Sequence, residues 1–214
     1  MAVAWLKSDL TVERVGETRQ FEDDDSVIVV THDMSEVERI RSIEPRYRKL
    51  SVDGTTIVEM TADEKAAVDA AASEAAQAAA LEAARAGQIA ELDQAYAAAQ
   101  QAGIDVGGGR RLKAEMLSAL AYRGQLDNLR DAIRLGRTNP ATGAAWSADD
   151  EVTATGADDS TVVFTSLADY EGAIVDGGIA LAAMTHAYRE TAAAIQAAEY
   201  LASVNAIVIN LGGD

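Results

Sequence analysis

The sequence contains no cysteine, two prolines and few aromatic residues. Of its 214 residues, 49% are hydrophobic but only 5% are aromatic. Without cysteine, the chain can form neither disulfide bonds nor thiolate metal sites. Alanine supplies much of the hydrophobic fraction, and helices that bury mostly methyl groups gain little, at about 25 cal/mol per Å² of apolar area. We therefore expect an extended molecule that is stabilised by partner copies.

Positive charge and long apolar runs are also scarce. The chain has 18 lysines and arginines against 35 aspartates and glutamates, which gives a formal net charge of -17. Such a surface repels phosphate backbones and anionic headgroups. No run approaches the roughly 18 apolar residues of a membrane span, and the first residues lack the apolar segment of a signal peptide. We therefore expect no nucleic acid partner, no membrane insertion and synthesis in the cytoplasm.

The first 60 residues predict a small α+β unit with a docking role. The predicted elements are a strand at 26–30, a helix at 35–43 that Pro45 ends, and two strands at 46–52 and 55–60. The Asp53-Gly54 dipeptide between the last two strands supplies the positive φ angles that a type I′ hairpin turn requires. Residues 1–60 are therefore predicted to form the first domain.

Thr61 and Glu64 have the spacing of a capping box, in which each side chain satisfies a free backbone amide of the other residue. An alanine-rich helix is predicted from 65 to 101, ending near Gly103, because alanine, glutamate, glutamine and arginine are strong helix formers. Its predicted packing positions are Val68, Leu81, Ile89 and Leu92, and Ala71, Ala75 and Ala78 continue a narrow small-residue face. Residues 61–106 are thus predicted to form a helical shaft.

Residues 107–214 are predicted to form a helical domain with short β segments. The predicted order is a flexible joint at Gly107, Gly108 and Gly109, a helix at 110–135 ended by Gly136, loops with short strand pieces at 137–160, a strand at 161–165, a capped helix that begins at Ser166 and Asp169, and a β-rich tail at 204–211. An exposed strand in the tail would pair with a partner. The fold class is therefore α+β, with long alanine-rich helices in a coiled coil or helical bundle.

The last long helix carries the strongest periodic pattern in the sequence. Apolar residues recur every seven positions at Leu167, Ile174, Leu181, Tyr188 and Ile195. A sustained heptad repeat is typical of a coiled coil or a tight helical bundle. We predict that these residues, with the four apolar positions of the shaft, pack between helices of the oligomer.

Residues with catalytic or metal-binding chemistry are few and dispersed. His32 and His186 are the only histidines and lie far apart in sequence, and nothing local suggests a catalytic triad around either. Because His186 lies beside Thr185 within the last helix, a helix-surface or bundle-facing role is predicted for it. The acidic runs 22–25, 149–151 and 158–159 offer oxygen ligands suited to calcium or magnesium, but they lack the spacing of an EF-hand loop. We predict that the chain is not an enzyme and uses no cofactor and no metal.

Two stretches resemble small tail proteins of bacteriophages. The segment 47–70 has the sequence YRKLSVDGTTIVEMTADEKAAVDA, which is similar to the hairpin and acidic alanine-rich helix of phage tail proteins and fibres. From the glycine run to the long last helix, the order of elements resembles an uncharacterised domain of phage tail-fibre and tail-assembly proteins. The resemblance covers about residues 47–200 and implies structural roles: Asp53 and Gly54 form a turn, Thr61 caps a helix, and Trp146 and Phe164 are packing anchors.

The resemblance implies a structural protein of the phage virion, in a tail fibre or at the periphery of the baseplate. Its expected partners are other tail or baseplate proteins and further copies of the chain, with a trimer favoured. A tail-fibre assembly chaperone that is not retained in the virion and a head or neck fibre remain alternatives. An enzyme or metal-binding module of the host is the alternative from another class.

Overall fold

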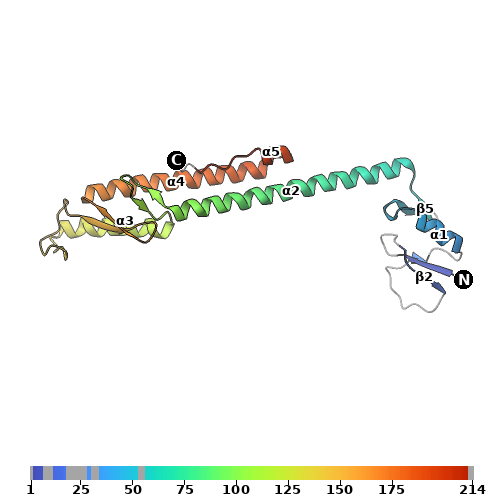
Figure 1. Cartoon of the computed structure of the whole chain (residues 1–214), viewed down its shortest axis with the longest axis horizontal. Coiled ribbons are helices and arrows are strands. Elements are labelled where there is room, and N and C mark those ends of the chain that lie inside the picture. The colour runs from blue at the N-terminus through green and yellow to red at the C-terminus, as the bar shows by residue number, and fades with distance from the viewer. Residues whose placement is uncertain (1, 7–11, 18–27, 30–33, 53–55, 212–214) are drawn as a thin grey trace. The chain divides into compact units, whose positions relative to one another are not determined.

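The computed structural model describes residues 2–6, 12–17, 28–29, 34–52 and 56–211 (Figure 1). Long helices alternate with short antiparallel strand pairs, which confirms the predicted α+β class. The chain divides into two compact units, residues 1–79 and 80–214. This division falls inside one long helix, whereas the sequence predicted boundaries after residues 60 and 106.

Unit 1 begins with a small antiparallel sheet of strand order β2-β1-β3. Its elements are β1 (Ala2–Leu6), β2 (Val12–Glu17), β3 (Ile28–Val29), α1 (Met34–Ser42), a 3-10 turn (Pro45–Tyr47), β4 (Arg48–Leu50) and β5 (Ile57–Glu59). The sequence predicted the helix and the last two strands, while β3 covers the described part of the strand predicted at 26–30. Strands β1 and β2 were not predicted.

The β4–β5 pair confirms the predicted hairpin, with Leu50 opposite Ile57. The turn residues Asp53 and Gly54 lie outside the described residues. Ile57 and Ile40 of α1 are both fully buried, so the hairpin and α1 share a small core. The buried guanidinium of Arg48 donates from Nε and Nη2 to the Ile43 carbonyl, at 3.0 and 2.8 Å, which satisfies the end of α1.

Helix α2 (Ala62–Ala102) begins at the predicted capping box. The Thr61 amide donates to Glu64 Oε2 at 2.8 Å, and the Glu64 amide donates to Thr61 Oγ1 at 3.4 Å. Lys49 of β4 also donates to Glu64, and this hydrogen bond, together with those from Thr61, lowers the Glu64 pKa to about 2. Gly103, at φ +74°, ends the helix where the sequence predicted its end.

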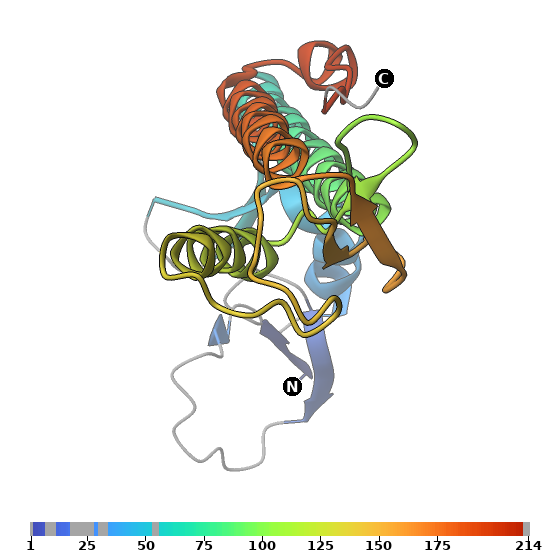
Figure 2. The same ribbon diagram turned by 90° about the vertical axis from the view of Figure 1, so that its left-hand side faces the viewer.

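Unit 2 places three helices around two small hairpins. After α2 come β6 (Ile104–Asp105), β7 (Arg111–Leu112), α3 (Met116–Arg134), β8 (Val152–Thr155), β9 (Thr161–Phe164), α4 (Leu167–Ala197) and α5 (Leu201–Asn205). Helix α4 runs antiparallel beside the second half of α2, as the end view also shows (Figure 2). Strand β9 and the capped start of α4 at Ser166 confirm two further predictions. The sequence did not predict that β9 pairs with β8.

Three predictions for unit 2 are wrong. The glycines at 107–109 do not form a flexible joint: all three have positive φ and form the tight turn of the β6–β7 hairpin, closed by a 2.9 Å bond from the Val106 amide to the Arg110 carbonyl. The helix predicted from 110 begins instead at Met116, because Arg111 and Leu112 pair with β6. The tail predicted as a strand starts within α5, and its described remainder contains no strand.

The core of unit 2 is formed where both hairpins meet α3 and α4. Phe164 and Tyr170 are fully buried, with ring centroids 5.0 Å apart, so Phe164 has the anchoring position that the resemblance implied. Trp146 is half-buried and is not among the core residues. Arg110 lies over the Phe164 ring and donates twice to Asp169, at 2.7 and 3.0 Å, which ties the β6–β7 hairpin to the start of α4.

Candidate binding groove between helices α2, α3 and α4

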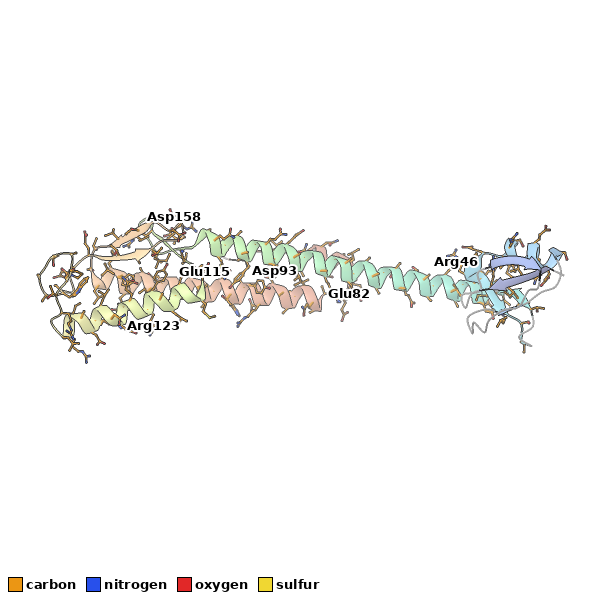
Figure 3. The ribbon with its side chains drawn as sticks, turned by 90° about the horizontal axis from the view of Figure 1, so that it is seen from below. Arg46, Glu82, Asp93, Glu115, Arg123 and Asp158 are labelled. Carbon is orange, nitrogen blue, oxygen red and sulfur yellow. The ribbon has the colours of Figure 1, made fainter. Side chains whose placement is uncertain are left out.

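A contact between two tyrosine rings and the hydrogen bonds of their hydroxyls join α2 to α4. Tyr96 of α2 and Tyr188 of α4 have ring centroids 4.8 Å apart. The Tyr188 hydroxyl donates to Asp93 Oδ1 at 2.7 Å, and the Tyr96 hydroxyl lies 3.1 Å from Thr185 Oγ1. Figure 3 shows Asp93 between the two helices. The hydrogen bond to Asp93 raises the pKa of Tyr188, so its hydroxyl remains a donor to higher pH than that of an unpaired tyrosine.

The heptad residues of α4 are used inside the chain. Ile195 is fully buried, as is Leu92 of α2, and Leu167 and Ile174 pack against the core of unit 2. Of the other two heptad residues, Tyr188 contacts Tyr96 and Leu181 lines the groove described next. The remaining predicted packing positions of α2, which are Val68, Leu81 and Ile89, are partly buried. Burial of the heptad therefore does not require a second chain, and the packing of these residues between copies stays a prediction.

A groove of about 750 Å³ lies between the end of α2, the start of α3 and the middle of α4. Its apolar lining includes Leu112 of β7, Ile174 and Leu181 of α4, and Tyr96 of α2. Gly177 and Gly178 also line it, and their missing side chains leave room between the helices. The volume is within the range of ligand-binding clefts.

The apolar surface continues out of the groove onto α3 and α4. Met116 and Leu120, which line the groove on α3, are 77% and 63% exposed. On α4, the neighbouring residues Val175 and Ile179 are 54% and 65% exposed. Exposed large apolar side chains at the groove, and on the helix that forms its wall, indicate a surface that another molecule covers.

The groove is locally basic in an acidic chain. Lys113, Arg123, His186 and Arg189 line it, and none of the described residues along its walls is an aspartate or glutamate. Lys113 forms an ion pair with Asp159, and His186 Nε2 lies 3.1 Å from a Glu190 carboxylate oxygen. Arg123, which projects from α3 (Figure 3), and Arg189 of α4 have no ion-pair partner within the described part of the chain.

The other residues considered for chemistry do not converge. His32 and the acidic run 22–25 lie outside the described residues. In the loop 137–151, Asp150 accepts from the Ser147 amide at 2.9 Å and from the Asn139 side chain at 3.0 Å, and these bonds lower the Asp150 pKa. This carboxylate therefore organises its own loop. Across 34–52 and 56–211, no group of histidine and acidic side chains is arranged to hold a metal ion.

Comparison with known proteins adds no relative. No protein-family model, curated protein or solved structure matches the chain. None of the described helices combines the length and the apolar character needed to cross a membrane.

Sequence analysis placed Leu181 in a packing stripe and His186 on the helix surface, but it did not identify the groove. The lining residues come from α2, β7, α3 and α4, so nothing in their spacing along the chain brings them together. One local signal was present: Met116, Leu120 and Arg123 follow each other at helical spacing on α3.

Proposed function

We propose that the chain is an oligomeric structural component of a bacteriophage virion, in a tail fibre or at the periphery of the baseplate. The resemblance at 47–70 supports the phage assignment. An unusual stretch of α2, described next, supports the oligomer. The expected partners are further copies of the chain and other tail or baseplate proteins.

The observation that carries the proposal is the exposure of α2 over Ala71–Ala80. All ten residues of this stretch are exposed, and seven of them are alanine. A surface helix normally buries one apolar stripe and turns polar residues to solvent. Here every side of nearly three turns is open and mostly apolar.

An uncovered helix of this kind gains nothing from tertiary packing. Its helicity depends on the intrinsic propensity of alanine and on its continuity with the rest of the 41-residue helix α2, since adding residues to a formed helix costs less than nucleating one. Alanine faces also let two helix axes approach to the short end of the usual 8–10 Å range. Packing other helices against Ala71–Ala80 would therefore bury apolar surface that the single chain leaves exposed, and this burial stabilises the oligomer.

The test is size-exclusion chromatography with light scattering on the full chain and on two matched variants. Ala75→Gln with Ala78→Gln changes the predicted small-residue face, and Ala76→Gln with Ala80→Gln changes a face roughly 150° around the helix. All four alanines are exposed, and glutamine alters neither charge nor helix propensity greatly.

We expect wild type and the 76/80 variant to form the same oligomer and the 75/78 variant to run near the monomer mass of 22.4 kDa. A monomeric wild type would contradict the proposal. An assembly chaperone, favoured by the open groove as a site for a partner segment, is the second candidate. It predicts that the protein is absent from purified phage particles, whereas a structural component is retained in them.

A further inference from the structure

We infer that the groove between α2, α3 and α4 receives the exposed α2 stretch of a second copy of the chain. The inference rests on the proposed oligomer and names the two surfaces that meet. One is the groove, with Arg123 and Arg189 at its edge. The other, called the ridge, consists of Ala71, Ala75 and Ala78, with Glu74 and Glu82 beside them.

Shape is the first argument for this pairing. The groove has helices as walls and glycines at 177 and 178, so it can receive a slim helix. The ridge is slim because methyl groups are its only side chains over two turns. Insertion of one helix face into an apolar groove is a recurring mode of protein recognition.

Charge is the second argument. The groove is lined by Lys113, Arg123 and Arg189, and the two arginines have no ion-pair partner among the described residues. The ridge is flanked by acidic residues: Glu74 is exposed, and the Glu82 side chain is 70% exposed although it pairs with Arg85. In a chain of net charge -17, contact between two copies needs such a basic surface, because acidic surfaces otherwise repel each other.

The pairing is heterologous, since the groove of one copy meets the ridge of the next. Contacts of this type close into rings when the rotation between neighbours allows it. A trimer, the assembly favoured from the sequence, is one such ring. A coiled coil of ridge against ridge is the competing arrangement.

The experiment combines a groove variant with a ridge variant of the full chain. The groove variant is Arg123→Glu with Arg189→Glu, and the ridge variant is the glutamine pair at 75 and 78. Arg134→Glu with Arg137→Glu is the control for the charge change, because both arginines are exposed and neither lines the groove. Far-UV circular dichroism establishes that all four proteins are folded.

We expect the groove and ridge variants each to run near 22.4 kDa and the control to keep the wild-type mass. Mixed in equal amounts, the two monomeric variants should form a 1:1 complex, because one supplies an intact groove and the other an intact ridge. A mixture of two monomeric variants that stays monomeric would overturn the inference.

Two further outcomes separate this inference from the proposed function. If wild type is oligomeric and the groove variant keeps the wild-type mass, the inference fails while the oligomeric function stands. If wild type itself is monomeric, the proposed function fails and the inference fails with it.

Discussion

Replacing Tyr170 with phenylalanine tests the hydrogen bonding inside the core of unit 2. Tyr170 is fully buried, and its hydroxyl lies 3.0 Å from Gln125 Oε1 and 3.2 Å from the Tyr122 carbonyl, both on α3. Gln125 Nε2 donates to the Thr153 carbonyl at 2.8 Å, which fixes Oε1 as the acceptor. The hydroxyl therefore links α4 to α3 through a donated hydrogen bond.

The expected loss of unfolding free energy follows from the acceptor, Gln125 Oε1, that has no donor once Tyr170 is replaced by phenylalanine. A buried acceptor without a donor costs about 1–3 kcal/mol. Gln125 is only partly buried, so water can reach it, and we expect the low end, about 1 kcal/mol. For a unit of this size, that loss corresponds to a Tm lower by about 3 °C.

The assay is urea unfolding followed by tryptophan fluorescence. It uses a Trp5→Phe background, in which Trp146 is the only tryptophan and its fluorescence therefore reports on unit 2. Tyr200→Phe is the control, since Tyr200 lies in the same unit and is 69% exposed, so removal of its hydroxyl should change stability by less than about 0.5 kcal/mol. An unchanged midpoint for Tyr170→Phe would refute the link between α4 and α3.

The same substitution should also change how the stability of unit 2 depends on pH. Burial raises the Tyr170 pKa from 10.0 to about 12. A raised folded-state pKa means that the stability is fully present below pH 10 and is lost as pH rises towards 12. Wild type should therefore lose more stability than Tyr170→Phe between pH 10 and 12, and parallel curves would contradict burial of the hydroxyl.

Three further predictions concern helix ends and an ion pair. Thr61→Ala removes the capping hydroxyl of α2 and should cost about 1 kcal/mol in urea unfolding. Gly103→Ala should abolish or strongly weaken folding in thermal melts, because φ is +74° and the added Cβ would lie 2.6 Å from the Leu112 carbonyl oxygen. Asp169 has a pKa lowered from 3.8 to about 2, chiefly by Arg110, so wild type should lose stability as pH falls from about 4 to 2, and Asp169→Asn should flatten that slope.

Each of these has a contradicting result. Gly87→Ala is the control for Gly103, since nothing lies within 4 Å of the added Cβ and an alanine in mid-helix should stabilise α2 by about 1 kcal/mol. Equal effects of the two glycine substitutions would remove the steric explanation. A Thr61→Ala protein as stable as wild type would mean that water satisfies the helix end, and an acid slope unchanged in Asp169→Asn would mean that other carboxylates carry it.

The features predicted correctly from the sequence are those encoded by neighbouring residues. Thr61 with Glu64 forms a capping box and Ser166 with Asp169 a weaker form of the same signal, each within four residues, so α2 and α4 begin where the sequence places them. The β4–β5 hairpin was likewise predicted from one dipeptide and its flanking strands. The heptad of α4 correctly predicted a helix but not its partner.

The errors arise where a local pattern had two solutions. Three glycines suit both a flexible joint and a tight turn, and pairing of Ile104 with Leu112 decided for the turn. That pairing also removed residues 111–112 from α3, although their sequence is compatible with a helix. The apolar residues after 204 were predicted as a strand, but the chain continues into α5 and has no described strand partner there.

The sequence alone therefore determined the starts of α2 and α4, the composition of the long helices and the acidic charge, because these depend on residues within a few positions of each other. Only the tertiary structure decided which faces are covered. It placed Tyr188 against Tyr96, left Ala71–Ala80 exposed, and brought Arg123 and Arg189 to one apolar groove. Those outcomes depend on contacts between distant segments, and periodicity along one helix does not specify what packs against it.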